Sequence, residues 1–203
     1  MLFRSSTVAN AQAQAVIEYL NAVYKNTDRG LYVGHMVQTK KLYEKAISLA
    51  GLTGNERVLD AYCGIGTIGL IASRDAREVI SVELNPDAVR DAVTNAKRNQ
   101  IKNVSFYQND AGAFMVSMAE KGEKADIVFM DPPRAGSDEA FLSSVVTLSP
   151  KKVVYVSCNP ETLARDLRYL TKHGYKAEEA WGYDMFAWSE HVETVCLLTQ
   201  KKA

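Results

Sequence analysis

The feature of this 203-residue chain that most restricts its fold is a regular alternation of short β-rich runs with helical stretches, which begins near residue 56. In the helical stretch 86–99, apolar side chains recur at i, i+3, i+4 spacing, and Pro86 suits the first turn of a helix. The β-rich runs are ERVLDAY, EVISVEL, NVSFYQND, ADIVFMD, KKVVYVSC, YKAEEAWGY and HVETVCLL. This alternation predicts an α/β fold with a mostly parallel sheet and helices on both of its faces.

The two ends of the chain depart from this alternation. The last two β-rich runs have no long helix between them, which predicts that an antiparallel hairpin closes the sheet. Residues 1–36 contain one amphipathic stretch, from about Ala9 to Lys25, and Gly34-His35-Met36 resembles the remnant of a cloning site. We therefore expect one α/β domain over residues 37–203, preceded by a helical segment or a foreign leader over residues 1–36.

Composition excludes several classes of protein. The 47% of hydrophobic residues suffices for a core, but no apolar run reaches the roughly 20 residues that cross a bilayer, and the N-terminus lacks the apolar region of a secretory signal. Cys63, Cys158 and Cys196 are too far apart for a disulfide framework or a CxxC metal site. Lys+Arg and Asp+Glu balance at 24 each, so net charge does not favour nucleic acid. We expect a cytoplasmic monomer.

A glycine turn follows the first β-rich run directly. The segment after VLDAY reads Cys63-Gly64-Ile65-Gly66-Thr67-Ile68-Gly69, so Gly64 and Gly66 stand where a strand must turn sharply into a helix and where a ligand can approach the backbone. Glu83 ends the next β-rich run, where its carboxylate can accept hydrogen bonds from two ribose hydroxyls. This arrangement predicts a nucleoside-containing cofactor, and an NAD enzyme would share it.

Two aspartates favour S-adenosylmethionine over NAD. Asp60 lies just before the glycine turn, where a carboxylate can organise the loop and face the ammonium group of this cofactor, whereas it would repel a pyrophosphate. Asp110 ends the third β-rich run, where it can accept a hydrogen bond from the adenine amino group. The alternative for both residues is that they only cap helices.

Two later β-rich runs end in reactive groups that should meet at the same edge of the sheet. The fourth leads into Asp131-Pro132-Pro133-Arg134, whose prolines stiffen the loop and hold Asp131 at the cleft. A DPP loop also occurs in amino-methyltransferases, but those usually carry an aromatic residue in place of Arg134. The fifth run delivers Cys158 next to a helix start at Pro160, whose dipole is expected to lower the pKa of the thiol. The alternative for Cys158 is an inert, buried cysteine.

Taken together, these segments resemble the RNA (uracil-5-)-methyltransferases, which modify uridines in 23S ribosomal RNA and transfer RNA. SCNPxTLARD and the late HVE are specific to this family, and the matches extend in family order from about Val37 to Leu198: VLDAYCGIGTIGL, VELNPDAVRDAVTNAKRNQIKNVSFYQNDA, DIVFMDPPRAG, VVYVSCNPETLARDL and HVETVCLL. The resemblance implies a class I S-adenosylmethionine-dependent methyltransferase fold of seven strands, with residues 37–203 as the catalytic domain and S-adenosylhomocysteine as the product.

The resemblance also implies a covalent mechanism. C5 of uracil is too weak a nucleophile to take the methyl group, so the thiolate of Cys158 adds to C6 and activates C5. Glu193 of the HVE motif then removes the C5 proton, which allows the thiolate to leave. Tyr62, Glu83 and Asp131 would contact the cofactor, and Asp131 would also orient a uracil flipped out of the RNA. An exposed strand carboxylate is the alternative for Glu193, and the role of His191 stays open.

The chain departs from the family in ways that bear on activity. LYVGHM offers no counterpart of the FxQxN motif that usually precedes the segment starting at Val37, and the DxFPxT motif reads DMFAWS, without a proline at Ala187. The family's RNA-binding β-barrel, its central domain and the cysteines of an iron–sulfur cluster are missing. We therefore expect no metal, weak RNA binding and low turnover.

Three other functions stay open. The chain can be a methyltransferase that acts on an exocyclic amine, which needs no nucleophilic cysteine. It can also be a module that binds the cofactor without catalysis, or an NAD oxidoreductase. The sequence does not identify the uridine or choose between ribosomal RNA, which we favour, and transfer RNA.

Overall fold

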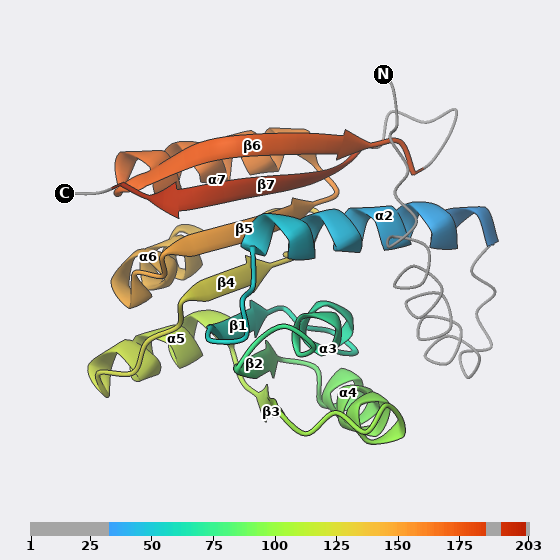
Figure 1. The fold of residues 1–203 in the computed structure, drawn as a ribbon. Helices are drawn as coiled ribbons and strands as arrows, with labels where there is room; N and C mark the ends of the chain where they lie inside the picture. The colour runs from blue at the N-terminus through green and yellow to red at the C-terminus, as the bar shows by residue number, and fades with distance from the viewer. Residues whose placement is uncertain (1–32, 186–191, 202–203) are drawn as a thin grey trace.

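The computed structural model describes residues 33–185 and 192–201, with side chains from Gln38 onward (Figure 1). Within these ranges, six helices and seven strands alternate along the chain. Their order is α2 (Val33–Ala50), β1 (Arg57–Ala61), α3 (Thr67–Ala72), β2 (Glu78–Glu83), α4 (Pro86–Arg98), β3 (Val104–Gln108), α5 (Ala111–Glu120), β4 (Ile127–Met130), α6 (Glu139–Leu148), β5 (Lys152–Ser157), α7 (Pro160–Lys172), β6 (Tyr175–Tyr183) and β7 (Glu193–Gln200).

The strands form one sheet in the order β3-β2-β1-β4-β5-β7-β6. Strands β1 to β5 run parallel to one another, whereas β7 is antiparallel to both β5 and β6. This confirms the expected seven-stranded sheet with a C-terminal hairpin. The chain moves outward from β1 to β3 and then returns to place β4 on the other side of β1, so the strand order reverses between β1 and β4. In open α/β sheets, ligands bind beyond the carboxyl ends of the strands at such a reversal.

Helices cover both faces of the sheet, as expected (Figure 1). Successive residues of a strand point to opposite faces, so neighbours such as Val58 and Leu59 enter different clusters of the core. The cluster that contains Leu59 packs against α5, α6 and α7, and the cluster that contains Val58 packs against α2 and α3. A smaller cluster joins α3 to α4. Core residues on both faces hold the carboxyl ends of the strands rigidly in place.

Side-chain caps determine where several helices begin. The Asn85 side chain accepts a hydrogen bond from the Asp87 amide at the start of α4, and Asn159 caps α7 in the same way. Pro86 and Pro160 occupy the first turn of these two helices, where a missing amide hydrogen does no harm. The helix predicted over residues 86–99 is confirmed, with Asn99 as its C-cap.

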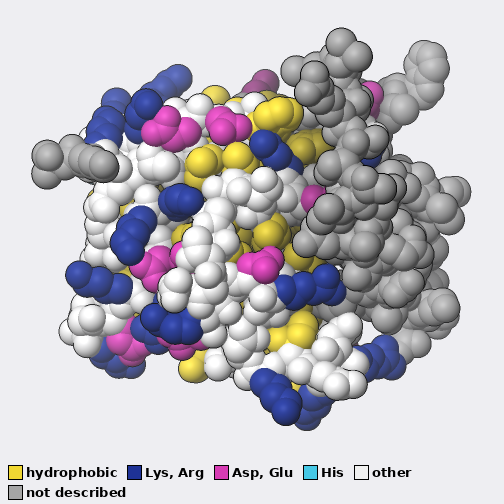
Figure 2. All heavy atoms as spheres, in the orientation of Figure 1, with side chains coloured by type: hydrophobic (Ala, Val, Ile, Leu, Met, Phe, Trp, Pro, Cys, Tyr) yellow, Lys and Arg dark blue, Asp and Glu magenta, His cyan; other side chains and the backbone are white. Residues whose placement is uncertain are grey.

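Helix α2 continues through the boundary expected between residues 36 and 37. The helix predicted from Ala9 to Lys25 lies outside the described residues, as does Ala187. None of the helices in the described ranges is both long and apolar enough to cross a membrane. On the face drawn in Figure 2, the described Lys and Arg side chains are interspersed with Asp and Glu, and no large surface of one sign is present there.

Candidate active site

A cleft of about 380 Å³ lies at the carboxyl ends of β1, β2, β3 and β4. Its volume suits a nucleoside-sized ligand. Its lining includes four of the side chains predicted to bind the cofactor: Tyr62, Glu83, Asp110 and Asp131. Leu84 also lines the cleft, and 67% of its surface is exposed. Sequence analysis missed Leu84 because an apolar residue directly after a strand, here the strand that ends at Glu83, is common and does not indicate a binding site. A large apolar side chain exposed beside a cleft can pack on the face of a purine ring.

The glycine turn has the shape expected of a strand that must turn into a helix. Tyr62 adopts a left-handed backbone conformation with φ of 62°, which non-glycine residues rarely do, and its ring packs on Phe141 with centroids 4.8 Å apart. Gly66 has φ of 87°, and an added Cβ would lie 3.1 Å from Phe106. The backbone therefore needs glycine at 66, both for its conformation and for its close packing.

Glu83 ties the glycine turn to the end of β2. One carboxylate oxygen accepts a hydrogen bond from the Gly64 amide at 3.0 Å, and the other accepts one from the Asn85 amide at 2.8 Å. Each oxygen retains a second lone pair, so the carboxylate can still accept bonds from two ribose hydroxyls. These contacts hold an acceptor in a fixed orientation at the cleft.

Asp60 holds the glycine turn from its buried side. Its side chain is buried, with 1% of its surface exposed, and accepts a hydrogen bond from the Gly69 amide at 2.8 Å. Burial, with smaller contributions from the charges of Asp131 and Glu83, raises the pKa of Asp60 to about 7, although the hydrogen bond from Gly69 acts in the opposite direction. Because Gly69 lies in the first turn of α3, Asp60 does cap a helix, as the alternative interpretation held. Its contact with the cofactor stays a prediction.

Asp110 occupies a position that is compatible with both roles considered for it in the sequence. It is the N-cap of α5, where its Oδ1 accepts a hydrogen bond from the Ala113 amide at 2.8 Å. It also lines the cleft on the exposed surface. Capping therefore does not exclude adenine recognition, because the second carboxylate oxygen can accept another hydrogen bond.

Three neighbouring strands bring Asp131, Cys158 and Glu193 to the same edge of the sheet. Asp131 follows β4, Cys158 follows β5, and Glu193 begins β7, which runs in the opposite direction. The last pair of the β5–β7 ladder is Ser157 with Thr194, so Cys158 and Glu193 are the next residues on the two strands. Asp131 also lines the cofactor cleft, and it therefore joins the cleft to the thiol and the second carboxylate.

The electrostatics of this group correct one expectation. The helix start at Pro160 is confirmed, but the pKa of the Cys158 thiol is raised and not lowered. Burial is the main cause, the carboxylates of Glu193 and Asp131 add to it, and the positive charge of Arg134 offsets only part of the effect. Burial of the thiol, together with two neighbouring carboxylates, outweighs the effect of the helix terminus.

The two carboxyl groups are also shifted toward their neutral forms. Burial and, to a smaller extent, the neighbouring charge of Glu193 together raise the pKa of Asp131 to about 7. Burial likewise raises the pKa of Glu193. Carboxylates with raised pKa values are stronger bases than exposed ones, which suits both groups to accept a proton.

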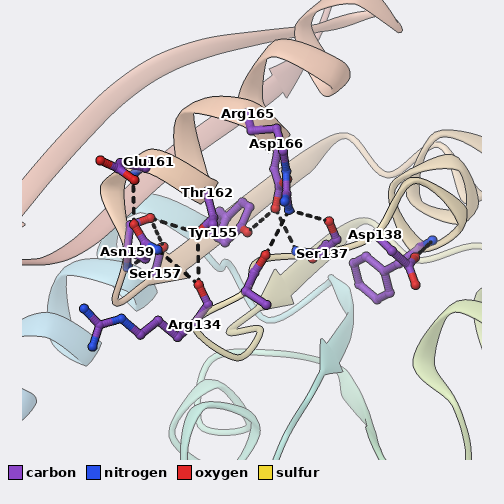
Figure 3. Close-up of polar contacts among 12 residues, drawn as sticks. Arg134, Ser137, Asp138, Tyr155, Ser157, Asn159, Glu161, Thr162, Arg165 and Asp166 are labelled. Carbon is purple, nitrogen blue, oxygen red and sulfur yellow. Dashed lines mark hydrogen bonds and ion pairs between the residues drawn. The ribbon is translucent and has the colours of Figure 1, made fainter.

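Hydrogen bonds between Ser157 and Asn159 hold the backbone on both sides of Cys158. The Ser157 hydroxyl donates a hydrogen bond to the Asn159 carbonyl at 3.0 Å and accepts one from the Asn159 amide at 3.1 Å (Figure 3). Cys158 therefore lies inside a small closed turn. His191 lies outside the described residues. Among the residues that are described, no group of three or more His, Cys, Asp and Glu side chains is arranged to hold a metal ion.

Comparison with known proteins gives the family of the chain. The model of the tRNA (uracil-5-)-methyltransferase family matches residues 11–201. An uncharacterized RNA methyltransferase of Halalkalibacterium halodurans is 47% identical over 173 residues, which are 85% of this chain and 38% of that protein. One from Staphylococcus aureus is 43% identical over 98% of this chain and 44% of its own length. The chain thus spans less than half the length of these relatives.

Solved structures agree with this result. The tRNA (uracil-54, C5)-methyltransferase of Pyrococcus abyssi, in complex with S-adenosyl-L-homocysteine, is 31% identical and superposes with a TM-score of 0.67 over 79% of this chain and 38% of its own. TrmN of Thermus thermophilus has a TM-score of 0.64 at 20% identity over 89% of this chain and 52% of its own, which shows a shared fold only. The fold is that of the class I S-adenosylmethionine-dependent methyltransferases, and the chain belongs to the tRNA (uracil-5-)-methyltransferase family.

Proposed function

We propose that this chain is the catalytic domain of an RNA methyltransferase that transfers a methyl group from S-adenosylmethionine to C5 of a uridine through a covalent Cys158 adduct. The observation that carries the proposal is the position of the Cys158 thiol between two carboxyl groups whose pKa values are raised, Asp131 and Glu193, beside a nucleoside-sized cleft. A thiol, a base and a cofactor site are the three components that methylation at C5 requires.

The residues of the cleft fit the proposed cofactor. Glu83 offers lone pairs for the ribose, Asp110 an acceptor for the adenine amino group, and Leu84 an apolar surface for the ring. Bound S-adenosylmethionine supplies an electrophilic methyl group on a sulfonium. The ionised form of Asp131 suits such a cationic ligand, whereas it would repel the pyrophosphate of NAD, and Glu83 would serve the ribose of either cofactor.

The residues of the chain then carry out the proton transfers. The raised pKa of Cys158 keeps the thiol protonated at neutral pH, so a neighbouring carboxylate must take its proton as the sulfur adds to C6 of uracil. Once C5 carries the methyl group, Glu193 removes the C5 proton, and the C6–S bond breaks to release 5-methyluridine and the thiolate. Asp131 lies where it can contact both the uracil and the cofactor.

We propose 23S ribosomal RNA as the substrate, with transfer RNA as the alternative that the family name and the Pyrococcus abyssi relative favour. We also propose that the chain alone turns over RNA slowly. Its net charge is zero, and on the face drawn in Figure 2 its basic side chains are mixed with acidic ones. Phosphate contacts from clustered Lys and Arg normally supply most of the affinity for RNA.

The test is to trap the covalent intermediate. RNA that contains 5-fluorouridine lacks the C5 proton, so elimination is blocked, and the protein mass should increase by that of the RNA fragment when cofactor is present. Cys158→Ala should abolish the adduct and retain cofactor binding, whereas Cys196→Ala, which alters a buried cysteine on β7, should form it. Full methylation of RNA by Cys158→Ser would refute the proposal and favour an amino-methyltransferase. Parallel reactions with 23S ribosomal RNA and transfer RNA decide between the two substrates.

A further inference from the structure

Asp166 is a fully buried carboxylate that the proposed mechanism does not use. It lies in the second turn of α7, and Figure 3 shows it at the centre of a polar network. Its Oδ2 accepts hydrogen bonds from the Tyr155 hydroxyl at 2.6 Å and from the Ser137 amide at 2.8 Å. Its Oδ1 accepts one from Arg165 Nε at 2.8 Å. Burying a carboxylate is costly, and here three hydrogen bonds and an ion pair compensate for that cost, because Arg165 Nη2 also lies 2.8 Å from Oδ1.

Arg165 extends this network to the loop that follows Asp131. Its Nη2 donates hydrogen bonds to the carbonyl of Ala135 at 3.1 Å and to the carbonyl of Ser137 at 2.8 Å. A guanidinium group can make these bonds and the ion pair with Asp166 together because its donors lie in one rigid plane. Arg165 and Asp166 therefore hold both the amide and the carbonyl of Ser137.

Two further side chains of the helix N-terminus hold the same loop at its other end. Asn159 Nδ2 and Thr162 Oγ1 each lie 3.3 Å from the carbonyl oxygen of Arg134, to which both donate (Figure 3). The backbone from residue 134 to residue 137 is therefore attached to α7 at both ends. Asp131 lies three residues before this attached segment, and Cys158 immediately precedes the capping residue Asn159.

Gly136 shows how closely the loop approaches the helix. Its φ is 74°, and an added Cβ would lie 2.6 Å from Arg165 Nη2 and 2.8 Å from Asp166 Oδ2. Even one methyl group would force the guanidinium and the carboxylate away from the loop. The glycine in DPPRAG and the Arg-Asp pair in SCNPETLARDL thus depend on each other in space, although they are far apart in the sequence.

We propose that Arg165 and Asp166 are positioning residues that set the spacing between Asp131 and the Cys158 thiol, and thereby the width of the gap that receives the uracil ring. Arg165 and Asp166 fix the loop of Asp131, and Asp166 also binds Tyr155, which lies three residues before Cys158 on β5. One carboxylate thus links the two elements that carry the reacting groups. The proposal rests on the proposed function for its consequence in catalysis.

Arg165→Lys is the principal variant, because 56% of the Arg165 side chain is exposed and lysine keeps the charge while losing the planar fork. Arg168→Lys is the matched control, since Arg168 is exposed one turn further along α7.

Two rates are measured. The first is the alkylation of Cys158 by iodoacetamide, followed by peptide mass, and the second is single-turnover adduct formation with 5-fluorouridine RNA. We expect Arg165→Lys to slow adduct formation about ten- to hundredfold, as small misplacements of reacting groups do, and to change the alkylation rate several-fold. The affinity for S-adenosylhomocysteine and the Tm should stay close to those of the parent.

Gly136→Ala tests the same spacing by displacing the Arg165 guanidinium and the Asp166 carboxylate from the loop without replacing either group, and it should reproduce the slow adduct formation of Arg165→Lys. Parental adduct and alkylation rates in both variants would overturn the proposal, and so would losses in rate that merely follow losses in Tm and in cofactor affinity. The two proposals fail separately. If the parent forms no adduct while alkylation still responds to Arg165→Lys, the proposed function fails and the positioning role stands. If the parent forms the adduct and neither variant slows it, the positioning role fails alone.

Discussion

The two halves of the sheet hold their functional groups in different ways. In the cofactor half, formed by β1, β2 and β3, each predicted carboxylate accepts hydrogen bonds from backbone amides of the adjacent turn: Asp60 from Gly69, Glu83 from Gly64 and Asn85, and Asp110 from Ala113. In the reaction half, formed by β4, β5 and β7, Asp131, Cys158 and Glu193 come from three separate strands. Burial raises the pKa values of all three groups, and the charge of Glu193 adds to the shifts of Asp131 and Cys158.

This difference separates binding from chemistry. A carboxylate that accepts backbone hydrogen bonds is oriented by local structure and is ready to meet a ligand. Groups that repel one another in a partly buried site are held near their neutral forms, so their protons can move when a substrate arrives. Variants in the reaction half should therefore change rates, and variants in the cofactor half should change affinity or stability.

The largest effect is expected from Glu193→Gln. Without the base that removes the C5 proton, turnover should fall about 10²- to 10⁴-fold, and a methylated adduct with ordinary uridine RNA should accumulate. Protein mass after incubation with RNA and cofactor measures this adduct. Glu178→Gln, on the neighbouring strand β6, alters an exposed carboxylate paired with Lys176 and serves as control. Unchanged turnover in Glu193→Gln would place the base elsewhere.

A smaller effect is expected from Glu83→Gln in the cofactor half. Glutamine has only one acceptor oxygen, so either the Gly64 or the Asn85 amide loses its partner, and the ribose loses a charged acceptor. The affinity for S-adenosylhomocysteine should fall about ten- to hundredfold, as measured by titration calorimetry. Glu78→Gln, at the other end of β2, changes an ion pair with Arg57 and should bind like the parent. Equal affinities in both variants would exclude Glu83 from the cofactor site.

The next effect concerns stability as a function of pH. The pKa of Asp60 is raised from 3.8 to about 7 in the folded protein, so between these values the folded state binds more protons than the unfolded state. This contribution to stability is complete below pH 3.8 and is lost as the pH rises through about 7. Asp60→Asn cannot ionise, so its unfolding free energy should decline by about 3–4 kcal/mol less than that of the parent over this interval. Urea denaturation at several pH values measures it, and parallel curves would contradict the assignment.

The smallest effect separates capping from recognition at Asp110. Asp110→Ala and Asp138→Ala each remove the N-cap of a helix, α5 and α6 respectively, so both should lower the unfolding free energy by about 1 kcal/mol. Only Asp110 also lines the cofactor cleft. Its variant alone should bind S-adenosylhomocysteine several-fold more weakly. If the two variants bind equally well, Asp110 is a cap and nothing more.

Local patterns predicted most of the architecture and the cofactor half. Strand boundaries, the glycine turn after β1 and the start of α4 at Pro86 follow from residues that are close together in the sequence. The same patterns misled at Cys158, because a helix start predicts a lowered thiol pKa, whereas burial of the thiol and the charge of Glu193, 35 residues away, both raise it. Leu84 and Asp166 carried no local signal, because an apolar residue after a strand and an acid within a helix are both common.

The amino-acid sequence by itself determined the order of the elements, the glycine turn proposed to receive the cofactor and the identity of the side chains proposed to react, because hydrophobic periodicity, caps and glycine positions act over a few residues. Only the tertiary structure decided what those side chains experience. The strand order β1-β4-β5-β7 brings Asp131, Cys158 and Glu193 together, and the approach of Gly136 to Arg165 and Asp166 fixes the loop between them. Burial and the repulsion of charges depend on distance in space, which residues far apart in the sequence acquire only when the sheet forms.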